Sequence, residues 1–454
     1  MKLLGKLCIS LLSVLMVVGF IPVNDVNAAV KLSATSKTIY VGRGYTLKLK
    51  GTSKKGHAKS SSSAVKVSAV KKTKKVKVRK RVTVKVKVRG KWKKKKVWRK
   101  VTVKKKVTVK NSFYLAGKRA GSADVSVTYG KKKIVCHVTV YQPQLNTVVG
   151  YTYNLASRLS HTSNSRYWTS NQAVALVDEY SGLLMPIHSG SCIIYRKVNN
   201  KVKSQIKINV KSSGDVKVGV DVSRHNGIVN FKTLKKNNIN FAIIRGGNGC
   251  RKYGTTDSSS IDLNLKRNIE GAKAAGMEIG LYWYLNSSTK GLMSSDDAKL
   301  QGERFADRLS SLDIEKNTPI YIDLEEHSAL LKSDSKKTKT ELQKEIAEFQ
   351  KEMCQIFEAK LREKGFKNIG IYASTSWYKD YLKNDYFMNK VDVGEEGITS
   401  HWLAHYNYAS KEGAQTPQFY YNGRLITPDI WQTGSRFRIS GTGSTYVDMN
   451  YLYQ

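Results

Sequence analysis

Acidic residues are almost absent from the first half of this chain. None lies between Val26 and Ala123, and the first 214 residues hold only 4 of them beside 46 lysines and arginines. From Asp215 onward, 33 basic residues are balanced by 30 acidic ones, so the formal net charge of +45 resides almost wholly in the first half. A polycation of this density repels itself and attracts a polyanion. We therefore expect the two halves to have different partners.

Cysteine is also scarce, with five residues among 454 and no Cys-x-x-Cys pair. This argues against a zinc site built on paired cysteines. The wide spacing of Cys136, Cys192, Cys250 and Cys354 does not resemble a disulfide framework either. The residues leave open whether these four form disulfides or remain buried thiols.

Long hydrophobic runs are missing, apart from one near the start. The apolar run of residues 11–21 follows two lysines and precedes Val26-Asn27-Ala28, a small-residue cleavage site. It is too short for a membrane span. Cys8 lies too near the start to be a lipid-anchoring cysteine. We therefore predict a signal peptide at residues 1–28 and a secreted mature chain that begins near Ala29 without a transmembrane segment.

Residues 29–141 and 142–212 carry alternating apolar and polar runs broken by Gly and Ser, which predicts two β-rich domains. They also resemble each other. Gly44-Tyr45-Thr46 matches Gly150-Tyr151-Thr152 at an offset of 106 residues, whereas Gly121-Ser122 matches Gly190-Ser191 at an offset of 69. The difference implies that the first copy carries about 37 extra residues in its middle.

These extra residues fall at about 71–107. Valine alternates with lysine or threonine over residues 82–88, the chain turns at Arg89-Gly90-Lys91, and the pattern resumes at Val101-Thr102-Val103. Side chains alternate across a strand, so the pattern predicts a β-ribbon with one valine face and one cationic face. A lysine run is usually only a solvated face. Here the density of like charge favours a polyanion that neutralises it.

The two β-rich domains resemble bacterial immunoglobulin-like domains of group 2. The resemblance covers most of residues 29–212, and it rests on Leu32-Ser33-Ala34-Thr35, Trp168-Thr169-Ser170-Asn171, the two Gly-Ser pairs and the closing strand His137-Val138-Thr139-Val140. It implies small β-sandwiches that serve as spacers or wall-binding modules, and it implies no catalysis.

The pattern changes after Ser212-Ser213-Gly214, which predicts that residues 213–454 form a third domain. Apolar strands there alternate with amphipathic helices. This alternation predicts a parallel sheet, most simply a barrel with its site at the C-terminal ends of the strands. The expected strands are residues 218–222, 241–245, 279–284, 320–324 and 369–372, and the expected helices are residues 231–237, 263–275, 298–309 and 342–364.

Two carboxylates end the fourth of these strands. Asp323 and Glu325 share one face of the strand, with their backbones roughly 6.6 Å apart, so each can influence the ionisation of the other. Asp221 ends the first strand, and Asp448 lies near the C-terminus. A single acid at a strand end is often a helix cap, but four together suit acid–base cleavage of a glycosidic bond.

Aromatic and amide side chains occupy the same strand ends. Flat rings can cover the apolar faces of sugars while their polar tips form hydrogen bonds, although each ring could equally belong to the barrel core. The candidate substrate-binding residues are Tyr282, Trp283, Tyr284, Trp402, Tyr406, Trp431 and Gln432.

Residues 216–453 resemble glycoside hydrolase family 25, the muramidases that cut bacterial wall peptidoglycan. The match runs in order through Gly219-Val220-Asp221-Val222-Ser223, Tyr321-Ile322-Asp323-Leu324-Glu325, Trp402-Leu403-Ala404, Trp431-Gln432 and Val447-Asp448-Met449-Asn450. The resemblance implies an irregular TIM-like α/β barrel. It also implies hydrolysis of the β-1,4 bond between N-acetylmuramic acid and N-acetylglucosamine.

The resemblance assigns the general acid to Glu325 and the other site carboxylates to Asp323, Asp221 and Asp448. If the acetamido oxygen of the substrate is the nucleophile, we expect Asp323 to orient that group. Substrate assistance and direct displacement both remain open.

Two features near the site fall outside this pattern. Arg224-His225-Asn226 occupies a variable part of the opening motif, so the specificity near Asp221 remains open. His225 and His405 lack a third ligand at metal-site spacing, so neither a metal nor another cofactor is expected.

The sequence thus predicts a multidomain, monomeric, secreted cell-wall hydrolase. Its barrel would bind peptidoglycan, and residues 29–212 would bind anionic wall polymers such as teichoic acid. The main alternative is a non-catalytic sugar-binding surface or adhesion protein. A further alternative makes residues 29–212 a nucleic-acid or heparin binder, but few aromatic residues there could stack on bases, so no specific nucleic acid is expected.

Overall fold

The computed structural model describes residues 29–89, 91–249, 260–286, 292–325, 337–406, 413–443 and 446–454. The predicted signal peptide at residues 1–28 and Cys250 lie outside these ranges. Two compact units make up the chain: one lies within residues 1–140, and the other consists mainly of residues 141–454. No helix in the described ranges is both long and apolar enough to cross a membrane.

The first unit contains two four-stranded sheets, in the orders β1-β3-β6-β5 and β2-β8-β7-β4. Both sheets contribute to one core: a Cβ placed on Gly56 would touch Leu49 of β3, Phe113 of β6 and Val127 of β7. The strands are β1 Lys31–Leu32, β2 Ser36–Tyr40, β3 Gly44–Lys50, β4 His57–Ser60, β5 Val65–Val88, β6 Lys91–Gly117, β7 Gly121–Tyr129 and β8 Lys132–Tyr141.

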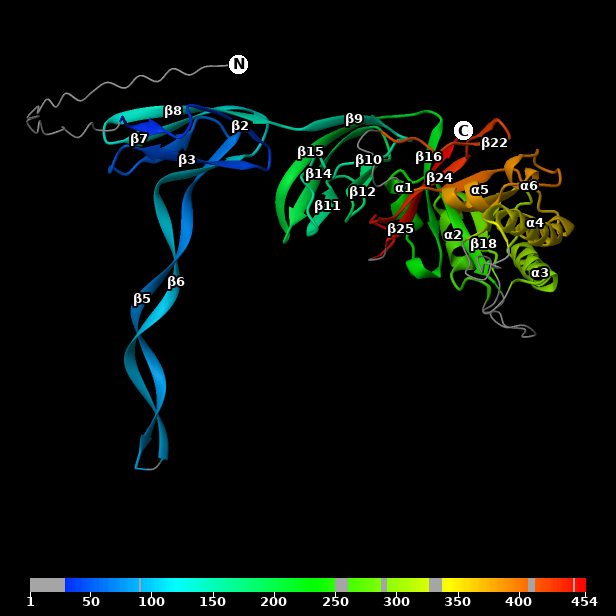
Figure 1. The fold of residues 1–454 in the computed structure, drawn as a ribbon, viewed down its shortest axis with the longest axis horizontal. Coiled ribbons are helices and arrows are strands. Elements are labelled where there is room, and N and C mark those ends of the chain that lie inside the picture. The colour runs from blue at the N-terminus through cyan, green and yellow to red at the C-terminus, as the bar shows by residue number, and fades with distance from the viewer. Residues whose placement is uncertain are drawn as a thin grey trace, which may run out of the picture. The chain divides into compact units, whose positions relative to one another are not determined.

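The strands β5 and β6 are far longer than the others, and together they extend from their sheet as a twisted ribbon (Figure 1). The predicted strand–turn–strand arrangement is therefore present, with Arg89 at the turn in a left-handed conformation (φ 48°). Valines such as Val82, Val84 and Val101 are half-buried, whereas the lysines between them are exposed. The ribbon has the two unlike faces that the alternation predicts.

The second unit begins with two further sheets, in the orders β10-β13-β12 and β11-β14-β15-β9. Gly190 at the start of β14 has a φ of 143°, close to the 133° of Gly121 at the start of β7, and each begins a long hairpin. The strands are β9 Gln144–Val148, β10 Tyr153–Asn154, β11 Ser165–Thr169, β12 Ala175–Val177, β13 Leu183–Pro186, β14 Gly190–Val198 and β15 Lys201–Lys211.

A closed eight-stranded barrel follows, in the order β16-β17-β18-β19-β20-β21-β24-β25. Neighbours from β16 to β24 pair in parallel, and β25 closes the barrel by pairing antiparallel with both β24 and β16. The strands are β16 Val216–Val222, β17 Phe241–Asn248, β18 Glu278–Tyr284, β19 Ile320–Asp323, β20 Ile369–Ser374, β21 His401–Ala404, β24 Ile430–Phe437 and β25 Val447–Tyr453.

Helices accompany only part of the barrel, and they lie outside it (Figure 1). They are η1 Arg224–Asn226, α1 Phe231–Lys236, α2 Leu265–Ala274, α3 Ser295–Ser311, α4 Lys339–Glu363, α5 Thr375–Tyr381 and α6 Asp385–Met388. In the described ranges, β21 is followed by the hairpin of β22 Phe419–Tyr421 and β23 Arg424–Ile426, and no helix separates β24 from β25. The alternation of strand and helix therefore holds through all the strands that the pattern predicted and continues as far as β21, because α5 and α6 lie between β20 and β21.

Where helices are missing, the preceding β-sheets cover the barrel. On β24, Thr433 contacts the sulfur of Met185 through its hydroxyl at 3.4 Å. On β25, the Tyr451 hydroxyl donates to the carbonyl of Pro186 at 2.7 Å, and the Tyr453 hydroxyl donates to the carbonyl of Gly150 at 2.9 Å. One continuous hydrophobic core therefore runs from residue 149 to residue 451.

Candidate active site

The two faces of each barrel strand meet different surroundings. The inner face carries an aromatic and aliphatic cluster that includes Phe241, Tyr321, Trp402 and Ile430. The outer face packs against helices or against β13. Because side chains alternate along a strand, the residues that follow the inner cluster toward the C-terminal strand ends also face inward. The predicted carboxylates occupy these inward positions.

Asp221 and Asp448 lie directly opposite each other on the antiparallel strands β16 and β25. Burial raises the pKa of Asp221, although hydrogen bonds from Asn450, Gln432 and Asp448 oppose this shift. Burial and the neighbouring Asp221 charge raise the pKa of Asp448 well above its ordinary value. Asp448 is therefore the member of this pair that holds a proton more readily.

A hydrogen-bond network fixes Asp221 in place. Its Oδ2 accepts from Nδ2 of Asn450 at 2.8 Å and from Nε2 of Gln432 at 2.9 Å. The Gln432 Oε1 in turn accepts the hydroxyls of Tyr406 at 2.8 Å and Tyr372 at 3.0 Å. Each polar atom of the Gln432 amide thus has a partner. The network therefore links the Asp221 carboxylate to Tyr372 on β20 and to Tyr406, which follows β21.

Asp323 ends β19 between Tyr284 on β18 and Tyr372 on β20, which are its register partners. Its side chain is buried, and its Oδ1 has no hydrogen-bond partner among the described residues. Burial, followed by the charges of Glu325 and Asp221, raises the pKa of Asp323 well above its ordinary value, while Arg245 opposes the shift. An oxygen in this position is available to a polar group of a bound ligand.

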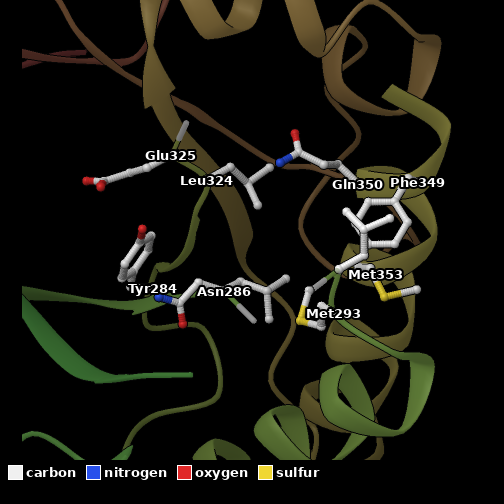
Figure 2. Close-up of a pocket in the computed structure, with 10 residues that line it drawn as sticks. Tyr284, Asn286, Met293, Leu324, Glu325, Phe349, Gln350 and Met353 are labelled. Carbon is white, nitrogen blue, oxygen red and sulfur yellow. The ribbon is translucent and has the colours of Figure 1, made fainter. Parts of the chain in front are cut away.

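Glu325 follows β19 and reaches the rim of the barrel. Figure 2 shows its carboxylate turned toward the Tyr284 hydroxyl and away from an apolar cavity of about 30 Å³ that Met293, Phe349 and Met353 help to line. Burial raises the pKa of Glu325, although a hydrogen bond from Tyr284 opposes this shift. A carboxyl group with this pKa direction and access to solvent can donate a proton to a ligand.

An open groove lies on the other side of Glu325. It has a volume of about 660 Å³, and its walls include Tyr372, Ser374, Lys379, His405 and Tyr406. We call it the Glu325 groove. Its size suits one or more sugar rings.

Arg245 and the buried Asp262 form an ion pair near the carboxylates. The guanidinium of Arg245 on β17 contacts Oδ2 of the buried Asp262 at 2.8 Å through a terminal nitrogen and at 2.9 Å through Nε. The same Oδ2 accepts the backbone N–H of Arg224 at 3.0 Å. Asp262 thus pairs with Arg245, whose charge bears on the pKa of Asp323, and it also holds the loop after β16.

Several predicted substrate-binding residues face the barrel interior or the groove. Tyr406 is 37% exposed and lines the groove, and Gln432 is buried within the network described above. Tyr284 contacts Glu325. Tyr282 and Trp402 lie deeper, with ring centroids 5.9 Å apart, and Trp402 donates from Nε1 to Oδ1 of Asn450 at 2.8 Å. The last two rings therefore support the site from within the core.

Trp283 and Trp431 do not lie at the site. Both are fully buried on the outer face of the barrel. Trp283 packs between Phe305 of α3 and Phe357 of α4 and donates to Gln301 at 2.9 Å. The prediction that these two tryptophans bind substrate is incompatible with their positions, because strand alternation turns them away from Tyr282, Tyr284 and Gln432.

The sequence did not identify Tyr372, Asn450, Arg245 or Asp262 as site residues. For Tyr372 and Asn450 a signal existed, since both occupy inward positions at strand ends. Asp262 lies in a loop, and only the fold brings it to Arg245. His225 lies near Arg245 and Asp262, which bear on its pKa, and His405 lies in the groove, away from His225. Across the described ranges, no three His, Cys, Asp or Glu residues gather as metal ligands would.

Comparison with known proteins identifies the barrel. Residues 220–442 match the family model for Glycosyl hydrolases family 25. No curated protein sequence matches this one.

Among solved structures, the chain is similar to a glycosyl hydrolase 25 of Streptococcus pneumoniae described as a virulence factor, with 22% identity over 52% of this chain and 87% of that chain (TM-score 0.36). It is also similar to a family 25 glycosyl hydrolase from Bacillus anthracis, with 20% identity over 52% of this chain and 89% of that chain (TM-score 0.35). The modular autolysin LytC of Streptococcus pneumoniae shares 18% identity over 61% of each chain (TM-score 0.40).

The order of the motifs and the family match lead to the same assignment for this part of the chain. Residues 220–442 form a glycosyl hydrolase family 25 domain, and the chain is a glycoside hydrolase.

Proposed function

We propose that this enzyme is a secreted hydrolase that cleaves the β-1,4 bond between N-acetylmuramic acid and N-acetylglucosamine in peptidoglycan. The observation that carries the proposal is the convergence of Asp221, Asp323, Glu325 and Asp448 at one end of the barrel, with Glu325 beside an open groove. Glycoside cleavage needs a carboxyl group that stays protonated until it reaches the leaving oxygen. Burial raises the pKa of Glu325, which is the direction of shift that this role needs.

The four acids have distinct roles in this proposal. Glu325 is the general acid. Asp323 orients the acetamido group of the substrate, a role supported by its unpartnered Oδ1. Asp221 and Asp448 act as a pair that keeps negative charge close to the position where the transition state develops positive charge. This arrangement is compatible both with substrate assistance and with direct displacement.

Analysis of the products tests the bond assignment. Purified peptidoglycan is digested with the full chain, the new ends are reduced, and the fragments are identified by mass spectrometry. The proposal predicts reduced muramic acid at the new ends. Reduced glucosamine would contradict the bond assignment, and the absence of soluble fragments would favour the non-catalytic sugar-binding alternative.

We further propose that residues 29–212 comprise two immunoglobulin-like domains, that the barrel is an irregular TIM-like α/β barrel, and that residues 1–28 are an export signal. A monomer would then remain associated with the cell wall through the ribbon of β5 and β6. Lysines on this ribbon are exposed along both strands, and such a surface suits anionic wall polymers such as teichoic acid.

A nucleic acid is the competing partner for the ribbon. Trp92 and Trp98 are 67% and 60% exposed, and the Arg81 guanidinium lies 5.8 Å from the Trp98 ring centroid. Two aromatic rings on a long cationic surface are few for base stacking, so the wall polymer remains our proposal. Competition between DNA and teichoic acid for the full chain separates the two, since the proposal predicts that teichoic acid displaces DNA.

A further inference from the structure

The Glu325 groove has an uneven distribution of charge. The carboxylates gather at the Glu325 side, where Asp323, Asp221 and Asp448 lie behind the general acid. Lys379 of α5 is the one lysine or arginine among the groove residues that the structure describes. His405 lies beside it, and burial together with the Lys379 charge lowers the pKa of His405, so this imidazole is neutral near pH 7.

Lys379 is available to a ligand. Its side chain is exposed, and within the described part of the chain it forms no ion pair. Its ammonium lies 5.9 Å from the ring centroid of Phe419, a weak contact that a ligand can replace. By contrast, the Arg245 guanidinium pairs with Asp262 at 2.8 Å. Lys379 is therefore free to pair with a negative group of a ligand in the groove.

The substrate of the proposed function carries negative charge on only one of its two sugars. N-acetylglucosamine is neutral, whereas the lactyl ether of muramic acid ends in a carboxyl group that is either free or joined to a peptide with carboxylates of its own. A glycan can enter a groove in two registers that differ by one sugar. A cation at a fixed place makes these registers unequal, because only one of them brings the carboxylate to that cation.

We propose that Lys379 binds a carboxylate of the muramyl unit and thereby sets the register in which the glycan lies across Glu325. The hydroxyls of Ser374 and Ser376 lie 2.9 Å apart in the same wall and can form hydrogen bonds to the sugar that carries this carboxylate. Lys379 is a specificity residue in this account and takes no part in proton transfer. The inference rests on the proposed cleavage of peptidoglycan.

The test compares Lys379→Met with Lys379→Arg in the full chain. Each variant and the wild type are assayed on stem-free glycan strands and on peptide-bearing strands, each with free carboxyl groups or with those groups converted to methylamides. The wild type should prefer the free acid by about 5-fold in kcat/KM, as expected for one solvent-accessible ion pair. Lys379→Met should lose this preference, so that it cleaves the free acid no faster than the methylamide. Lys379→Arg should retain most of the preference.

The two substrate pairs identify the source of the carboxylate. A preference on stem-free strands assigns the lactyl carboxylate to Lys379, and a preference only on peptide-bearing strands assigns a peptide carboxylate. Equal rates on acid and methylamide for the wild type, or an equal loss on both for Lys379→Met, would overturn the inference while leaving the proposed function intact. If the wild type cleaves none of the four substrates, both this inference and the proposed function are wrong.

Discussion

At the scale of single residues, Asp323 is held in an environment that opposes its ionisation. Its side chain is buried, one of its oxygens lacks a hydrogen-bond partner among the described residues, and two further acids lie close to it. Burial of a charge without a partner costs free energy. The buried Asp323 therefore lowers the stability of the fold, while it places a carboxyl group where it faces the ligand.

This cost predicts a pH-dependent gain in stability for Asp323→Asn. In the unfolded chain Asp323 ionises near pH 4, whereas its pKa in the fold is raised, so the stability of the wild type falls as the pH rises above about 4. The asparagine variant does not lose stability in this way, because asparagine does not ionise. Its melting temperature should match that of the wild type at about pH 3.5 and exceed it at pH 7, by about 2–4 °C for each kcal/mol regained.

Thermal unfolding followed by circular dichroism at several pH values checks this expectation. Asp392→Asn, a change at an exposed acid, serves as the control and should leave the melting temperature unchanged at every pH. If Asp323→Asn were less stable than the wild type at pH 7, the account of Asp323 as a destabilising buried acid would be wrong.

The sequence predicted the four acids because their spacing follows from strand alternation and from the order of the motifs. The same alternation, applied strictly, would have excluded Trp283 and Trp431, whose neighbours Tyr282, Tyr284 and Gln432 face inward. Asp262 could not be found this way, since its pairing with Arg245 depends on a loop whose path no periodicity predicts. Long-range pairs of this kind need the fold.

At the scale of elements, the ribbon of β5 and β6 carries more like charge than its packing can offset. A two-stranded ribbon has few partners for its side chains, and directly opposed like charges destabilise a strand pair. Half-buried valines such as Val97 and Val107 shield one face, whereas the lysines around them remain in solvent. An anionic polymer along the lysine face would relieve this repulsion.

Replacing four ribbon lysines by glutamine should therefore weaken binding to walls. The variant changes Lys93, Lys94, Lys95 and Lys96, and binding of the full chain to teichoic acid-bearing walls is measured by sedimentation at increasing salt. We expect a loss of roughly 10-fold at low salt and a smaller dependence on salt than in the wild type, because screening acts on fewer contacts.

The matched control removes the same charge elsewhere, by glutamine at Lys232, Lys235, Lys236 and Lys273, which are exposed on α1 and α2. It should bind nearly as well as the wild type. Equal losses in the two variants would mean that net charge, and not the ribbon, governs binding.

Most elements of the barrel were predictable from the sequence, because each strand is a short apolar run and each long helix carries an apolar stripe. The expected helix at residues 342–364 corresponds to α4 Lys339–Glu363, and the expected strand at residues 369–372 to β20 Ile369–Ser374. The last three barrel strands could not be ordered from pattern alone. Their closure depends on β25 pairing antiparallel with β16, a contact between the two ends of the domain.

At the scale of the whole molecule, residues 142–212 act as an outer wall of the barrel. They cover the side where no helix packs, through Met185 and Pro186 against Thr433 and Tyr451. At the edge of this interface, Nε of Arg438 forms an ion pair with Oε2 of Glu179 at 2.7 Å. The sequence suggested a boundary near Ser213, yet the hydrophobic core continues across it.

Truncation at two points tests this wall. A chain of residues 141–454 should unfold at a temperature close to that of residues 29–454. A chain of residues 213–454 exposes the outer face of β24 and β25 and should melt roughly 10 °C lower or more, because several large apolar side chains lose their cover. Calorimetry measures the melting temperature of each chain, and light scattering shows whether it is a monomer. A monomeric 213–454 chain with an unchanged melting temperature would show that the wall is dispensable.

The central claim is that Glu325 is the general acid, and Glu325→Gln tests it most directly. Release of reducing sugar from purified peptidoglycan is measured for the wild type, for this variant and for Glu396→Gln, a change at an exposed acid away from the strand ends. The account predicts that Glu325→Gln loses about 10²–10⁴-fold in rate while it binds walls and melts no lower than the wild type, and that Glu396→Gln stays active. A Glu325→Gln variant that releases sugar at the wild-type rate would contradict the account.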